Sequence, residues 1–261
     1  MPTAKNTDKF GVEFSCDWET LVSAPKTLTE YTISDGVKTI QLSAFKDCTT
    51  LVHVNIPASV RIIRAAAFAG CGSLVSIDIP DGVTSIGAWA FKMCASLTSI
   101  KIPKGISKIE ERTFRECKSL SSACIPHGVK SIGKWAFAHC DSLTDVHIPD
   151  GVLNIGNRAF TGCLSLVTLH LPDSVAKIGR SGFAQCSSLV SVRLPLGLQK
   201  IGTDVFAGCD SIKLCELGEA TSFRKSAFPS DCRFLTPIKA RRIRAQQIAG
   251  SRAADGVDPV G

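Results

Sequence analysis

The chain has 261 residues, of which 44% are hydrophobic and 20% charged, with a formal net charge of +7 at pH 7. This balance is ordinary for a folded protein and too apolar for an intrinsically disordered one. Part of the positive charge falls in the last 25 residues, so the rest of the chain is only mildly basic, which argues against a specific nucleic-acid partner.

Residues 1–27 precede the regular pattern of the chain and are expected to form an N-terminal cap. Within them, the segment from Lys9 to Trp18 alternates apolar and polar positions, as a strand or hairpin does. This region lacks the apolar core of a secretory signal, and no apolar run in the chain approaches the ~20 residues that a transmembrane helix needs. The sequence therefore predicts a cytoplasmic location, or a surface or secreted one if a signal precedes these residues.

Residues 28–234 repeat with a period of 23 residues in about nine copies. The copies align as Leu-x-x-Φ-x-Φ-Pro-x-Gly-Φ-x-x-Ile-Gly-x-x-Ala-Phe-x-x-Cys-x-Ser, where Φ is aliphatic. The last copy is degraded, because Gly218 replaces the proline and Phe228 falls one position early. Phenylalanine recurs at Phe45, Phe68, Phe91, Phe114, Phe137, Phe160, Phe183 and Phe206, and cysteine recurs from Cys48 to Cys232 at the same spacing.

Each copy is interpreted as one coil of a repeat solenoid. The Leu-x-x-Φ-x-Φ stretch puts two aliphatic side chains on one face of a short strand, and proline ends that strand because it cannot donate to a ladder. The Φ-x-x-Ile-Gly stretch returns the chain along the other side. The Ala-Phe-x-x-Cys stretch predicts a short turn or one turn of helix, with Phe and Cys inward. The cysteines are then expected to be reduced and buried, since their parallel Cβ vectors do not favour disulfides.

Three segments carry a family resemblance: IGAWAFKMCASL (86–97), IGKWAFAHCDSL (132–143) and IGNRAFTGCLSL (155–166). They resemble the BspA-like class of leucine-rich repeats, and the resemblance covers residues 28–234. It implies a right-handed leucine-rich-repeat coil with a parallel β-sheet on the concave face and short strands or turns on the convex side. It also implies a binding or adhesion role, so a cell-surface adhesin is the alternative to a protein-interaction module.

The strand positions between the aliphatic residues are expected to face outward, where equivalent residues of successive coils form columns. These columns vary from coil to coil while the aliphatic columns hardly change, so they could hold a partner-binding surface. A solvated face with no partner is the alternative. The candidate partner-binding residues on this face are His53, Asn55, Asp78, Lys101, Asp145, His147, His170 and Arg193.

Cys124, His147 and His170 share one of these columns, with Asp145 beside His147. Because these are metal-ligand residue types, a metal-binding or catalytic sheet around Cys124 and His147 is a further alternative. Parallel side chains in a row do not converge tetrahedrally, however, so the sequence predicts no metal and no cofactor. The motifs GxSxG, HExxH and CxxC are absent from the sequence, as is the full phosphate-loop motif, GxxxxGK followed by Ser or Thr, and we expect the protein not to be an enzyme.

A column on the convex side alternates tryptophan and arginine over four coils, as Trp89, Arg112, Trp135 and Arg158. The repeat should bring each guanidinium within ~6 Å of an indole ring, the range of a cation–π contact. The column is either a structural stack that covers the turn or an interface, since Trp and Arg dominate binding energies. These four residues complete the candidate partner-binding set.

Residues 235–261 follow the repeats. Pro237 can open a basic helix, IKARRIRAQQIAG, which is followed by a stretch expected to be disordered. The helix could make a weak contact with an anionic surface, although a solvated tail is the alternative. The predicted main partner is a protein whose identity the sequence does not specify.

Overall fold

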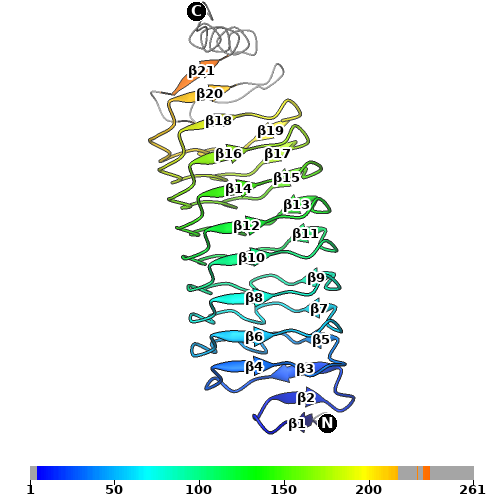
Figure 1. The fold of residues 1–261 in the computed structure, drawn as a ribbon. Coiled ribbons are helices and arrows are strands. Elements are labelled where there is room, and N and C mark those ends of the chain that lie inside the picture. The colour runs from blue at the N-terminus through cyan, green and yellow to red at the C-terminus, as the bar shows by residue number, and fades with distance from the viewer. Residues whose placement is uncertain (1–4, 217–227, 229–231, 236–261) are drawn as a thin grey trace, which may run out of the picture.

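The protein is described by a computed structural model covering residues 5–216, 228 and 232–235. Figure 1 shows the chain winding from one end to the other as a single elongated stack of coils. It is a parallel-strand β-solenoid of about nine turns, and the described residues include no helix. The predicted repeat solenoid is confirmed.

The first sheet is formed by the Leu-x-x-Φ-x-Φ part of each coil, and its strands are parallel and pair in register. In the strands from β4 to β18 the middle residue is buried and its two neighbours are exposed. The ladder is interrupted twice, but backbone bonds from Thr98 to Val75 and from Val190 to Val167 still join the coils there. The strands are β4 (Glu30–Thr32), β6 (His53–Asn55), β8 (Ser76–Asp78), β10 (Ser99–Lys101), β12 (Ser122–Cys124), β14 (Asp145–His147), β16 (Thr168–His170), β18 (Ser191–Arg193), β20 (Leu214–Glu216) and β21 (Arg233–Leu235).

A second sheet of two-residue strands, interrupted once between Ile86 and Lys108, comes from the Φ-x-x-Ile-Gly part of the coils. The glycine that follows is required by close approach, since a Cβ atom on Gly156 would lie 2.7 Å from the backbone of Gly133 in the preceding coil. The strands are β5 (Thr39–Ile40), β7 (Ile62–Ile63), β9 (Ser85–Ile86), β11 (Lys108–Ile109), β13 (Ser131–Ile132), β15 (Asn154–Ile155), β17 (Lys177–Ile178) and β19 (Lys200–Ile201).

The N-terminal strands β1 (Lys5–Thr7), β2 (Glu13–Ser15) and β3 (Thr20–Ser23) form an antiparallel meander. Because β3 pairs in parallel with β5, this meander extends the second sheet rather than the first (Figure 1). Val12 and Phe14 are buried, whereas Phe10 and Cys16 are exposed, so only part of the alternating apolar set enters the core.

Tyr31 joins the meander to the first coil. It takes the strand position that holds an aliphatic residue in most coils, and its hydroxyl donates a 2.6 Å hydrogen bond to Asp8 in the turn between β1 and β2. Burial, together with this bond to a carboxylate, raises the pKa of Tyr31. The contact fixes the meander over the open end of the coil.

The Ala-Phe-x-x-Cys segments form tight turns, so the suggestion of a helical turn is wrong. Two residues in each coil, four positions apart, have left-handed backbone angles, for example Trp89 with φ 66° and Met93 with φ 61°. Their N–H groups bond forward to the next coil, to the carbonyl oxygens of Glu111 at 2.9 Å and Arg115 at 2.8 Å. A helix would direct these N–H groups back along its own turn, so bonding between coils excludes it.

The phenylalanine of each coil lies inside the stack and is almost fully buried. From Phe45 to Phe206 successive rings are stacked with centroids 5.0 to 5.7 Å apart. Phe228 of the degraded last copy stacks on Phe206 at 4.9 Å, although it falls one position early in the sequence. The ladder therefore continues to the end of the described solenoid.

The repeated cysteines form a second internal ladder beside the rings. From Cys71 to Cys209 each thiol donates to the backbone carbonyl of the phenylalanine 26 residues earlier, at 3.0 to 3.3 Å. Burial raises the pKa of Cys71 and of Cys117 to about 12. No cysteine of this ladder is in a disulfide, which confirms the expectation of buried thiols.

Candidate binding surfaces

The first-sheet face, meaning the outward residues of the strands β4 to β20, carries the eight candidate residues predicted for the sheet. All eight are exposed. Strand register places Asn55 opposite Asp78 and His147 opposite His170, so they form columns across neighbouring coils. The predicted exposure and columns are confirmed, and binding by these residues stays a proposal.

Two cations of this face lean toward the loop of the preceding coil. Lys101 lies 3.6 Å from Asp81, and Arg193 lies 3.2 Å from Asp173. A backbone N–H of Leu196 donates to Asp173, and this bond together with Arg193 holds the pKa of that carboxyl below its usual range. Exposed pairs of this kind contribute ~0–1 kcal/mol to stability, so these side chains remain available to a partner.

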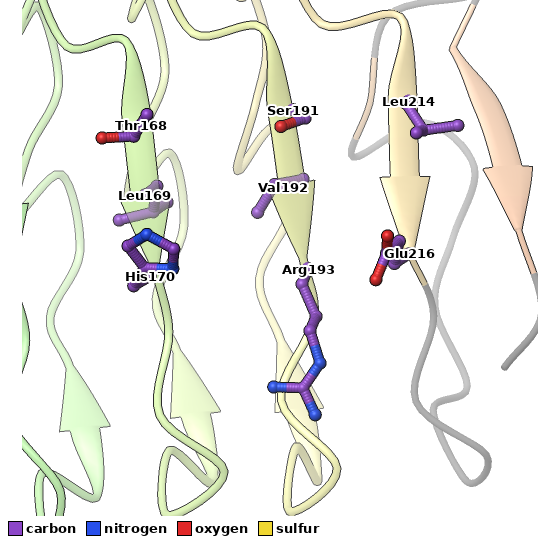
Figure 2. A pocket seen from close by; sticks show the side chains of 8 residues that line it. All are labelled: Thr168, Leu169, His170, Ser191, Val192, Arg193, Leu214 and Glu216. Atoms are coloured by element: carbon purple, nitrogen blue, oxygen red, sulfur yellow. The ribbon is translucent and has the colours of Figure 1, made fainter. Parts of the chain in front are cut away.

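A shallow depression of about 490 Å³ lies across β16, β18 and β20. Figure 2 shows the side chains of His170, Arg193 and Glu216 at the same end of the three strands. The remaining lining residues are Thr168, Leu169, Ser191, Val192 and Leu214. The depression thus offers an imidazole, a guanidinium and a carboxylate in a row beside small hydroxyl and apolar groups.

Cys124, His147 and His170 lie directly opposite one another on β12, β14 and β16, as the sequence predicts. Asp145 accepts a 3.0 Å hydrogen bond from Thr168, a neighbour in the next coil. In the described parts of the chain no three His, Cys, Asp or Glu side chains come together as a group that could hold a metal ion. The alternative of a metal-binding sheet receives no support from this geometry.

The predicted contacts between tryptophan and arginine on the turns are present. The Arg112 guanidinium lies 5.1 Å from the Trp89 ring and 6.0 Å from the Trp135 ring. Trp135 is also contacted by Arg115 at 5.1 Å and by Arg158 at 4.9 Å. Three guanidinium groups therefore surround Trp135, which matches the structural interpretation of the column at this residue.

Two arginines of the stack, Arg112 and Arg115, have carboxylate partners beside them. Arg112 pairs with Glu111 at 2.5 Å and Arg115 with Glu116 at 2.8 Å. The Nε atoms of both arginines are buried without a hydrogen-bond partner in the structure. The charges are thus balanced locally, and the indole faces cover the rest of the guanidinium groups.

A depression on the turns was missed by the sequence reasoning. It measures about 510 Å³ and spans three coils, from Leu42 to Met93, with Trp89 in its lining. Its lining includes the four alanines Ala65, Ala66, Ala69 and Ala88, to which the sequence reasoning gave no role at a surface. The signal that could have revealed it is Met93, at a position where other coils have Gly70 or Gly162.

Among the residues that the structure describes, none form a helix long and apolar enough to cross a membrane. Leu235 closes strand β21, and the predicted basic helix and tail (236–261) lie outside the described residues.

Comparisons with known proteins agree with this fold. The family model of the BspA type leucine rich repeat region matches residues 23–130 and 107–236 in six copies. Among solved structures, a leucine rich repeat protein of T. pallidum is 27% identical, with a TM-score of 0.60, over 93% of this chain and 92% of that protein. A leucine rich cell surface protein of Faecalibacterium prausnitzii is also 27% identical, with a TM-score of 0.51, over 80% of this chain.

This chain spans only 64% of the Faecalibacterium protein. The pneumococcal vaccine antigen PcpA, 18% identical over 84% of this chain and 65% of its own length, shares the fold with a TM-score of 0.52. A comparison with curated proteins gives no match. The family model covers most of the chain, and its repeat is the coil seen in the structure, so the chain belongs to the BspA-type leucine-rich repeat family.

Proposed function

We propose that this chain is a non-catalytic binding module that holds a protein partner on its first-sheet face. The observation that carries the proposal is the contrast between the two sides of each strand. The inward residue is aliphatic in nearly every coil, whereas the outward columns change in charge and size from coil to coil. Variation at exposed, regularly spaced positions allows a solenoid to fit one particular partner.

The chemistry of the face suits a polar partner surface. Lys101 and Arg193 have partners only in exposed pairs, so a carboxylate of the partner can replace those partners at small cost. The depression at β16 to β20 gives the partner an anchor point, which Arg193 lines opposite Glu216 and Leu214 lines opposite Ser191. Arginine is enriched among the residues that dominate interface energies.

A second candidate function is that of a cell-surface adhesin. The Faecalibacterium relative, 27% identical, is described as a cell surface protein. The cytoplasmic location expected from the sequence has no support in the comparisons, and we extend the proposal to a surface or secreted location. The absence of shared catalytic residues in this family supports a binding role over an enzymatic one.

Site-specific photo-crosslinking tests the proposal. A benzoylphenylalanine placed at Ser99, exposed on β10 of the first sheet, should crosslink to a partner protein in an extract or on the surface of the source cells. The same group at Ser85, exposed on β9 of the second sheet, is the matched control. A specific crosslinked band at Ser99 alone is expected. Equal bands at both serines, or a band at Ser85 alone, would contradict binding on the first-sheet face.

A further inference from the structure

The depression on the turns, called here the alanine groove, is an apolar surface exposed to solvent. Its floor is made by small residues such as Ala65, Ala66 and Ala88. Three larger apolar side chains stand around this floor and remain exposed: Leu42 at 58%, Trp89 at 40% and Met93 at 46%. A volume of about 510 Å³ is large enough to take apolar side chains from another molecule.

Met93 is not explained by the needs of the fold. Its backbone is left-handed, with φ 61°, a conformation that costs a residue other than glycine ~1–2 kcal/mol. Its side chain is exposed, so burial in the core does not offset that cost. Other coils place small or polar residues at the equivalent position: Asp47, Gly70, Glu116, His139, Gly162, Gln185 and Gly208. Methionine is an adaptable side chain that is frequent at binding surfaces.

Trp89 differs from Trp135, its equivalent two coils further on. Trp135 is contacted by three guanidinium groups, whereas Trp89 is contacted by Arg112 and by the Lys92 ammonium at 5.5 Å. On the side of Trp89 away from Arg112, the preceding coil has Ala66 at the equivalent position. The alanine side chain is too small to cover the indole ring. Trp89 is therefore an exposed aromatic wall of the groove.

Charge around the groove favours an acidic occupant. Lys46 and Lys92 line it, against the single carboxylate of Asp47. Neither lysine has an ion-pair partner within the described chain. Arg112 continues the positive edge toward the next coils, although it is paired with Glu111.

We propose that the alanine groove docks an acidic segment of a protein, which inserts apolar side chains between Leu42 and Trp89 and places carboxylates near Lys46 and Lys92. Aromatic and methionine side chains supply contact area, and the two lysines select against basic segments. This surface lies on the turns, away from the first sheet, and the proposal does not depend on binding at the first-sheet face.

Methyl NMR tests the proposal directly, because the chain contains only two methionines, Met1 and Met93. With carbon-13 on the methionine methyl groups, Met93 reports on the groove and Met1 serves as an internal control. The probe is a synthetic peptide of alternating Glu with Leu and Phe. A second peptide has Lys in place of Glu, and a third has Ser in place of Leu and Phe.

The acidic apolar peptide is expected to shift the Met93 signal saturably, with a Kd below ~1 mM, and to leave Met1 unchanged. Trp89→Ala should remove the saturable shift, and Lys46→Gln combined with Lys92→Gln should weaken binding by at least about fivefold. Trp135→Ala, the matched control, should leave the Kd unchanged.

Three outcomes would overturn the proposal: no shift of Met93 with the acidic peptide, equal binding of the Lys peptide, or equal losses in Trp89→Ala and Trp135→Ala. The crosslinking result at Ser99 is independent of all three, so failure at the groove and failure at the first-sheet face can be told apart.

Discussion

Phe91 and Trp89 are two residues apart on the same turn, and their columns follow opposite rules. The inward column keeps phenylalanine in eight successive coils, each ring stacked on the next. The outward column changes from Ser43 through Trp89 and Arg112 to Asp204 while keeping the same left-handed backbone. The backbone conformation is therefore the same at both columns in successive coils, whereas the residue type is constant only in the inward column. The inward columns should control stability and the outward ones binding.

The largest effect expected from the inward side is loss of stability in alkali. Burial raises the pKa of the ladder thiols, for example that of Cys71 to about 12, so they stay protonated in the folded state above pH 9, where the unfolded chain loses its protons. Stability is fully present below the ordinary thiol pKa of ~8.5 and falls above it by ~1.4 kcal/mol per thiol per pH unit. Chemical denaturation at pH 8, 9 and 9.5 measures this slope.

The pH window below 10 isolates the thiols, because Tyr31, whose pKa the fold raises, loses its proton in the unfolded chain only near the ordinary tyrosine pKa of ~10. Cys140→Ala should reduce the slope by about one thiol's share, because burial raises the pKa of that thiol. A slope insensitive to Cys140→Ala would mean that the buried thiols do not cause the alkaline loss.

Phe137→Ala is expected to produce the next largest loss. The ring lies between Phe114 at 5.1 Å and Phe160 at 5.2 Å, and its removal leaves a cavity in the middle of the ladder. The cost should be ~3–5 kcal/mol, measured by urea denaturation. Each coil contacts mainly its two neighbours, so the stacked rings should contribute directly to stability. A urea midpoint for Phe137→Ala equal to that of wild type would show that the ladder does not hold the stack together.

Gly156→Ala should cost ~1–3 kcal/mol, because the new Cβ would clash with the backbone of the preceding coil at 2.7 Å. Gly72→Ala is the matched control, with no atom within 4 Å of the added Cβ, and it should be close to neutral. Urea denaturation of the two variants, each compared with wild type, measures both costs. Equal midpoints for both variants would mean that the coils can separate without cost.

The smallest effects belong to the outward column. Trp135→Ala should cost ~1–2 kcal/mol, since three cation–π contacts are lost at once. Trp89→Ala should cost less than ~1 kcal/mol, because it loses contacts with Arg112 and Lys92 only. Thermal melting compares the stability of the two variants. A larger loss of stability for Trp89→Ala would contradict the conclusion that Trp135 is the structural tryptophan and Trp89 the exposed one.

Much of this coil could be predicted from the sequence. Recurrence of proline, phenylalanine and cysteine at 23 residues gives the number of coils, the inward ladders and the outward columns, including the contacts of Arg112 with both tryptophans. The residue types and spacing are sufficient there because each column repeats one local environment.

The rest depends on how neighbouring coils meet. The hydrogen bond from Cys140 to the carbonyl of Phe114 joins residues 26 positions apart, and no local sequence pattern predicts it. Forward bonding from Trp89 decides between a helix and a tight turn. The alanine groove was missed because small residues of three coils create it together, and each coil alone shows an ordinary alanine.

The most direct test of the account compares charge reversals on two faces for their effect on the partner identified through Ser99. Lys101→Glu with Arg193→Glu alters the first-sheet face, and Lys177→Glu with Lys200→Glu makes the same change in net charge on the exposed side of the second sheet. We predict at least about tenfold weaker binding for the first pair, unchanged affinity for the second, and similar melting temperatures for both. Equal losses of affinity, or a loss confined to the second sheet, would contradict the claim that the outward columns of the first sheet bind the partner.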